Sequence, residues 1–207
     1  MAFIDITRPL HTGLQPWPGD QPPEFHLSSR IRDGDLCNVG RLTLSTHNGT
    51  HADAPFHYND AGPTIDALPP ERFIGPARVI DARGHATFTE NLFAGLDLAA
   101  TPRVLLRTDT WTDPTVFPKT WPLLAPGLPA WLAARGVTLL GLDIPSVESL
   151  DSTGIPQHLA MDAAGILILE NLDLRAAPAG VYELIALPLR IRGGDGSPIR
   201  AVLRMQD

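Results

Sequence analysis

Proline occurs along the whole chain and limits the length of every regular element that the chain can form. The 207 residues contain 21 prolines and 18 glycines, and this proline content is about twice the average. Proline interrupts the interior of helices and of central strands. The sequence therefore predicts many short strands and helices joined by stiff turns, and it excludes a coiled coil.

The overall composition is that of a globular protein, and the length fits a single domain over residues 1–207. Hydrophobic residues make up 43% of the chain and charged residues 19%. Two smaller domains would also fit this length. A domain of this size buries a full core without disulfides, and the single cysteine, Cys37, cannot form an internal one.

The charge balance and the first residues argue against several classes of partner. The chain has 16 basic and 23 acidic residues, a formal net charge of −7, and no cluster of lysine or arginine. Nucleic acid is therefore not an expected partner. The start has no signal-peptide pattern, and apolar stretches such as residues 137–142 are too short to span a bilayer. We expect a cytoplasmic protein without a membrane partner.

Short apolar or alternating stretches predict a mixed α/β fold dominated by sheet. The elements do not alternate regularly between strand and helix, so a doubly wound sheet is not expected. In residues 41–45, Leu42 and Leu44 are predicted to lie on the buried face of a half-buried strand. The predicted strands are 3–6, 25–31, 41–45, 77–81, 103–107, 137–142, 166–169, 181–187 and 199–203, and the predicted helices are 128–135 and 156–164.

Three histidines and an aspartate form the pattern H-x3-H-x-D-x3-H over residues 47–57. Imidazole and carboxylate groups are ligands for zinc and also suit manganese or iron. On an extended backbone, His51 and Asp53 would point to the same face. Gly49 allows a tight turn that could bring His47 back toward them. The pattern predicts a metal site, although each histidine alone could be a separate surface residue.

Two further ligand candidates lie far along the chain. His158 is on the predicted helix 156–164, and Glu170 ends the apolar run 166–169. A buried carboxylate needs a partner, and a metal would be one. A position at the solvent rim without a role remains the alternative for Glu170.

Several stretches carry a family pattern: HNGTHADAPFH at 47–57, WPGD at 17–20, GLDIPS at 141–146, His158 with ILENL at 168–172, and DGSPIRAVL at 195–203. Together they resemble the metal-dependent cyclase-like hydrolase family over nearly the whole chain. Within that family the chain is similar to the members that hydrolyse aryl formamides. The stretches 17–20 and 195–203 are what make the chain similar to these members in particular.

The resemblance implies a binuclear zinc site, and manganese or another divalent metal would suit the same side chains. It implies that His47, His51 and Asp53 hold the first metal, with Asp53 bridging to the second. It further implies that His158 binds the second metal and that Glu170 bridges both.

The resemblance also implies a reaction, a fold and an assembly. The reaction would be hydrolysis of N-formyl-L-kynurenine to L-kynurenine and formate by metal-activated water, in tryptophan degradation. His57 would donate and accept protons, and Trp17 would contact the aromatic part of this small-molecule substrate. The fold would be a compact, sheet-rich α/β domain of the swivelling β/β/α type, assembled as a homodimer.

Two other functions compete with this one. A relative that opens a cyclic amide such as isatin would use the same ligands. A metal-binding module without turnover would need the ligands alone, and it would leave the additional acid/base residue His57 unexplained. A serine hydrolase is not supported, because the chain has no GxSxG motif.

Overall fold

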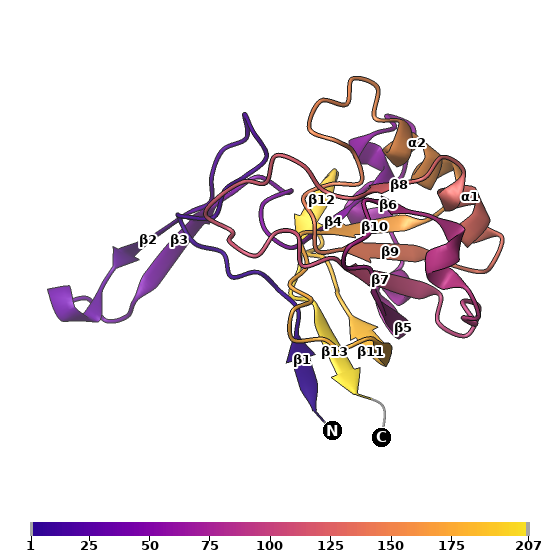
Figure 1. Ribbon diagram of the computed structural model, residues 1–207. Coiled ribbons are helices and arrows are strands. Elements are labelled where there is room, and N and C mark those ends of the chain that lie inside the picture. The colour runs from indigo at the N-terminus through magenta and orange to yellow at the C-terminus, as the bar shows by residue number, and fades with distance from the viewer. Residues whose placement is uncertain (1, 206–207) are drawn as a thin grey trace.

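A nine-stranded mixed sheet forms the centre of the protein, in a computed structural model that describes residues 2–205. The strand order is β1-β13-β11-β5-β7-β9-β10-β4-β12, and the pairs β2-β3 and β6-β8 form two small separate sheets (Figure 1). The strands are β1 (Phe3–Asp5), β2 (Glu24–Ser29), β3 (Val39–Thr43), β4 (His51–Asp53), β5 (Ile74–Asp81), β6 (Thr87–Phe88), β7 (Arg103–Arg107), β8 (Leu123–Leu124), β9 (Leu139–Leu142), β10 (Leu167–Glu170), β11 (Gly180–Ile185), β12 (Gly196–Pro198) and β13 (Val202–Met205).

The helices are short, as the proline content predicts. The α-helices are α1 (Leu128–Ala133) and α2 (Pro156–Ala163), and 3-10 helices cover Ile31–Asp33, Pro55–His57, Ile65–Ala67, Pro70–Phe73 and Glu90–Phe93. Proline stands near the start of both α-helices, where its missing N–H costs no hydrogen bond. Within residues 2–205, no helix has the length and apolar character needed to cross a membrane.

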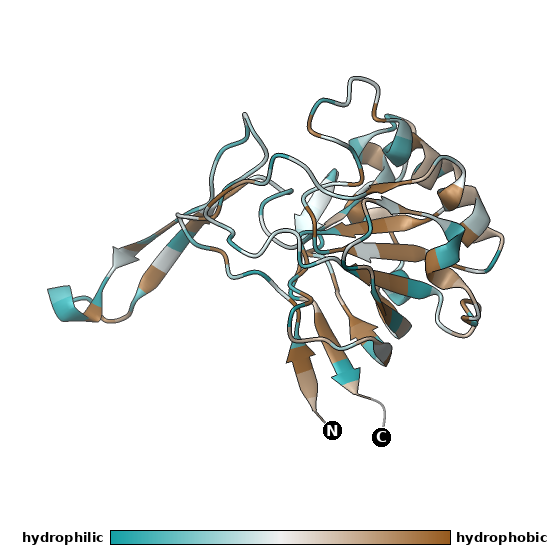
Figure 2. Cartoon of the chain, in the orientation of Figure 1, coloured by the Kyte–Doolittle hydropathy of each residue, from teal (hydrophilic) through white to brown (hydrophobic). Residues whose placement is uncertain are grey.

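The middle of the sheet is parallel, and its strands β7, β9 and β10 are buried on both faces. Strands β5, β7, β9 and β10 run parallel in that order, and α1 and α2 each connect two of them. Along β7, Leu105 belongs to one hydrophobic core, whereas Val104 and Leu106 belong to the other. A strand that is buried on both faces is apolar at most of its positions. Figure 2 accordingly colours most of these strands brown. The fold is therefore the mixed, sheet-rich α/β type that the sequence predicts.

All of the predicted strands and helices are present, with boundaries moved by up to three residues. The last strand starts later than predicted, at Val202, because Ile199 instead forms an isolated bridge with Pro188. The structure has more strands than the nine predicted from the sequence. The additional ones are short, such as the two-residue strands β6 and β8, which contain too few residues to show an alternating pattern.

The prediction of a half-buried strand at residues 41–45 is wrong about the burial of Leu42, whereas Leu44 is half-buried just beyond the end of β3. Strand β3 is exposed along its whole length, and Leu42 keeps 49% of its surface accessible. The reason is that β3 pairs only with β2, in a hairpin that projects away from the main sheet (Figure 1). Neither face of this hairpin meets the core, so alternation in the sequence does not report burial there.

Candidate metal centre

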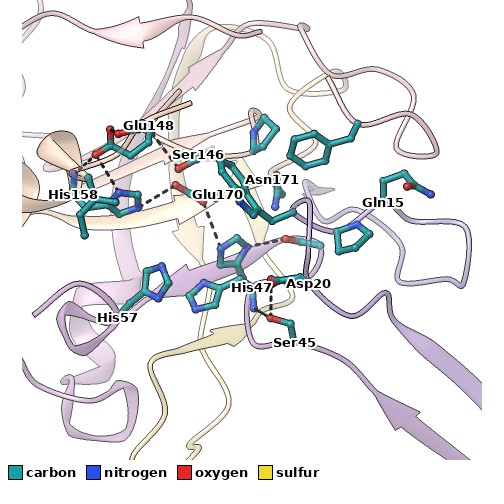
Figure 3. Close-up of a pocket in the computed structure, with 18 of the residues that line it drawn as sticks. Gln15, Asp20, Ser45, His47, His57, Ser146, Glu148, His158, Glu170 and Asn171 are labelled. Carbon is teal, nitrogen blue, oxygen red and sulfur yellow. Dashed lines mark hydrogen bonds and ion pairs between the residues drawn. The ribbon is translucent and has the colours of Figure 1, made fainter. Parts of the chain in front are cut away.

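A cavity of about 470 Å³ opens where the N-terminal loops meet the ends of the central strands (Figure 3). Its walls come from segments far apart in the sequence. The residues that line it include Gln15, Trp17, Asp20, Ser45, His47, His51, His57, Trp111, Phe117, Ser146, Glu148, His158, Glu170, Asn171 and Asp195. Six of the seven residues expected to form the site therefore line one pocket, and the seventh, Asp53, contacts three of its histidines.

Strand β4 supplies the centre of the cluster. His51 and Asp53 are both fully buried, and Nε2 of His51 lies 3.3 Å from Oδ1 of Asp53. The two side chains lie on one face because they are two residues apart on an extended strand. In the β4–β10 pair His51 stands opposite Glu170, and its Nε2 lies 3.6 Å from Oε2 of that carboxylate.

A turn before β4 brings His47 back to the same point. Gly49 has a φ of 64°, in the left-handed region that glycine adopts without steric cost. Nδ1 of His47 then lies 3.1 Å from Oδ1 of Asp53. The placement of His47 by a turn at Gly49 agrees with the expectation from the sequence.

The two remote candidates come into the same cluster. Nε2 of His158, on α2, lies 3.7 Å from Oδ2 of Asp53 and 3.9 Å from Oε1 of Glu170. Glu170 keeps only 5% of its surface accessible and accepts a hydrogen bond from the backbone N–H of Val147. A position at the solvent rim is therefore excluded for Glu170.

The three imidazoles share one arrangement that suits metal binding. In each ring one nitrogen lies beside an outer oxygen: Gly49 O for His51, Glu148 for His158, and Asp195 for His47. The other nitrogen faces the carboxylates of Asp53 and Glu170. This is how metal-ligating histidines are commonly held.

Two unpartnered atoms provide a further test of whether a metal fits. Nε2 of His51 and Oδ2 of Asp53 are buried and have no hydrogen-bond partner within the described residues. An orphaned buried polar atom costs free energy, and a divalent cation would satisfy both atoms. The donor set of imidazole nitrogens and carboxylate oxygens suits zinc, manganese or iron.

The electrostatics of the cluster also favour a bound cation. Burial opposes protonation of His47, but hydrogen bonds with Asp195 and Asp53 outweigh it and raise the pKa of His47 to about 10. Burial, together with the neighbouring charge of Asp53, raises the pKa of Glu170. The carboxylates of Asp53 and Asp195 contribute to these shifts, and a metal ion bound among them would neutralise their negative charge.

Three sets of three side chains place their ligand atoms within 4.8 Å of one another. They are His47 with His51 and Asp53, Asp53 with His158 and Glu170, and His47 with His57 and Asp195. The first two sets share Asp53 and are buried apart from the half-buried His47, whereas the third includes the exposed His57 and the half-exposed Asp195.

His57 and Trp17 line the pocket beside this cluster. The ring centroids of His57 and His47 lie 4.0 Å apart, and 37% of the His57 side chain is accessible. Trp17 is half-buried in a turn closed by a hydrogen bond from Asp20 N–H to Trp17 O. Its indole packs edge-on against Phe117 and Trp121. Trp17 therefore contacts the body of the protein and also presents surface to the pocket.

Sequence reasoning did not single out Glu148 and Asp195, which hold His158 and His47 from outside the cluster. Asp195 begins the stretch 195–203, which carries part of the family resemblance. That resemblance marked the stretch but implied no function for Asp195. Glu148 had no local signal, because its relation to His158 exists only in the folded chain.

Two solved structures share this architecture over nearly their full length. One, described as a potential metal-dependent hydrolase with cyclase activity, has a TM-score of 0.83 and 26% identity, covering 100% of this chain and 99% of that one. The other, isatin hydrolase A from Ralstonia solanacearum, has a TM-score of 0.80 and 25% identity, covering 98% and 91%. The fold and the ligand cluster thus define a metal-dependent hydrolase.

A family model described as putative cyclase matches residues 4–149. The chain belongs to this cyclase family. A kynurenine formamidase from Salinibacter ruber is 45% identical over 210 residues, which cover 99% of this chain and 98% of that protein.

Proposed function

We propose that this protein is a kynurenine formamidase, which hydrolyses N-formyl-L-kynurenine to L-kynurenine and formate in tryptophan degradation. The similarity to the Salinibacter ruber relative over the full length of both chains supports this activity. The structural observation that carries it is the pair of ligand sets that share the buried Asp53 and include histidines lining an aromatic pocket.

We propose the following assignment of the ligands. His47, His51 and Asp53 would hold one divalent metal, and Asp53, His158 and Glu170 would hold a second. Zinc suits this set of side chains, and manganese remains an alternative. A divalent metal bound here lowers the pKa of a water molecule and polarises the carbonyl oxygen of a substrate.

The residues around the cluster handle the protons of the reaction. Attack of water on the formyl carbon forms a C–O bond, and breakage of the C–N bond releases an arylamine, which must gain a proton. Burial lowers the pKa of His57, so its ring is neutral at pH 7 and can accept the proton of the attacking water. The imidazolium then formed can return that proton to the leaving amine. Its Nδ1 lies 3.7 Å from Asp195, whose charge stabilises it.

Trp17 provides an apolar surface for the aryl ring of the substrate. We expect Trp17→Ala to raise KM for N-formyl-L-kynurenine about tenfold, since an aromatic contact of this kind is worth about 0.5–1.5 kcal/mol beyond its buried area. Metal content should stay at the wild-type value. Steady-state kinetics with metal analysis would check both, with Trp131→Ala as the control, since Trp131 is on α1 and does not line the pocket. A large loss of metal in Trp17→Ala would contradict a substrate-contact role.

One assay tests the proposed activity and its metal dependence together. Purified protein is mixed with N-formyl-L-kynurenine, and kynurenine release is followed before chelation, after chelation and after zinc is restored. We expect release that chelation abolishes and zinc restores. Release that survives thorough metal removal would refute the metal mechanism and leave the substrate assignment standing.

Opening of a cyclic amide is the second candidate function, because an isatin hydrolase shares the fold at a TM-score of 0.80. Isatin in the same assay separates the two functions. Turnover of isatin without release of kynurenine from N-formyl-L-kynurenine would favour this candidate.

We further propose that residues 1–207 act as one hydrolase domain, that the protein assembles as a homodimer, and that it works in the cytoplasm. The family resemblance supports the assembly. The formal net charge of −7 gives it no affinity for nucleic acid, and its partner is the small-molecule substrate.

A further inference from the structure

The loop that precedes β12 contacts the ring of His47 from outside the metal centre. Oδ2 of Asp195 lies at hydrogen-bond distance, 3.0 Å, from Nε2 of His47. Oδ1 of the same carboxylate accepts a hydrogen bond from the hydroxyl of Thr46 at 2.8 Å. The second bond restricts rotation of the carboxylate, so one oxygen stays directed at the imidazole.

The next residue makes room for the same ring. A Cβ atom on Gly196 would lie 2.9 Å from Cε1 of His47 and 3.0 Å from the carbonyl oxygen of Ala52. Real Cβ atoms rarely approach other atoms this closely, so no larger residue fits while the ring is in place. Gly196 also stands opposite Asp53 in the β12–β4 pair. The ring is therefore enclosed between Asp195, Gly196 and Asp53.

A neutral imidazole carries one proton, and the two neighbours of His47 compete for it. Nδ1 faces Asp53 at 3.1 Å, and Nε2 faces Asp195 at 3.0 Å. A metal ligand must present an unprotonated nitrogen. A carboxylate that accepts the proton at one nitrogen leaves the other free and also increases its basicity.

We propose that Asp195 and Gly196 form a seat for His47, which places the proton on Nε2 and directs Nδ1 toward Asp53 and the metal. Asp195 is then a positioning residue that acts on the metal through His47. This inference rests on the ligand assignment under the proposed function, and it gives a role to the start of the stretch 195–203.

The third set of ligand atoms offers a competing role for Asp195. His47, His57 and Asp195 could themselves hold an ion, in which case Asp195 would be a ligand. Removal of the Asp195 carboxylate would have a different effect on metal binding in each role. Loss of a positioning residue weakens the metal affinity and leaves the number of bound ions unchanged, whereas loss of a ligand lowers that number.

The test measures zinc binding to metal-free protein by competition with a chromogenic chelator. We expect Asp195→Ala to weaken zinc affinity about 10- to 100-fold, the usual effect of removing the partner of a ligating histidine. Asp195→Asn keeps an oxygen of the same reach without the charge, and it should give an intermediate affinity. The control is Asp60→Ala, an exposed aspartate without a side-chain hydrogen bond or ion pair in residues 2–205.

Each outcome decides the inference. Weaker zinc affinity with unchanged stoichiometry in Asp195→Ala, and wild-type affinity in Asp60→Ala, would support the seat. Wild-type zinc affinity in Asp195→Ala, with only a lower melting temperature, would overturn it, and so would a lower stoichiometry. A wild-type protein that binds zinc but releases no kynurenine would refute the proposed activity and leave the zinc comparison valid.

Discussion

Asp53→Ala is expected to lose bound metal and turnover together. Asp53 is common to both of the ligand sets proposed to hold metal, and its carboxylate lies within 3.1–3.7 Å of a nitrogen in each of three imidazoles. Removal of this carboxylate takes one ligand from each proposed metal at once. The remaining histidines would also lose the negative charge that orients them.

Metal analysis after dialysis, together with kynurenine release, would measure this effect. We expect the metal content of Asp53→Ala to fall to background, and added zinc should not restore activity. Asp60→Ala, which removes an exposed carboxylate, should keep the wild-type metal content and rate. A thermal melt should show a folded protein. Full metal occupancy in folded Asp53→Ala would refute the bridging assignment.

His57→Ala is expected to have the opposite pattern, with metal retained and turnover lost. His57 lies beside the ligand cluster, with its ring 4.0 Å from that of His47 and 5.9 Å from that of His158. Its lowered pKa keeps it neutral at pH 7, as a general base must be. General acid–base catalysis contributes about 10²–10⁴ in rate, so kcat should fall by about that factor.

The pH dependence gives a second measurement of the role of His57. Because its pKa is lowered, the base form is present at neutral pH and is lost only as the pH falls below the usual imidazole value of about 6.5. The acid limb of the kcat profile should therefore lie below that value and disappear in His57→Ala. His85→Ala, which changes an exposed histidine away from the pocket, is the matched control. Near-normal turnover in His57→Ala would exclude the role.

Local features of the metal centre could be predicted from the sequence, because they depend on short spacings. His51 and Asp53 share a face since side chains alternate along an extended strand. The turn at Gly49 and the stiff prolines likewise act on their immediate neighbours. The same argument fails for the exposed hairpin that contains β3. The alternating pattern predicts that Leu42 faces the core, but no other part of residues 2–205 packs against that side of the hairpin, and Leu42 stays exposed.

The sequence by itself determined the ligand types, the short elements and the family resemblance of this protein. Only the tertiary structure decided which residues surround those ligands. Glu170 meets His51 because β10 pairs with β4, and Asp195 meets His47 across 148 positions of the chain. Sheet order and loop packing set these contacts, and they depend on the burial of apolar surface over the whole domain, which no short spacing in the sequence records.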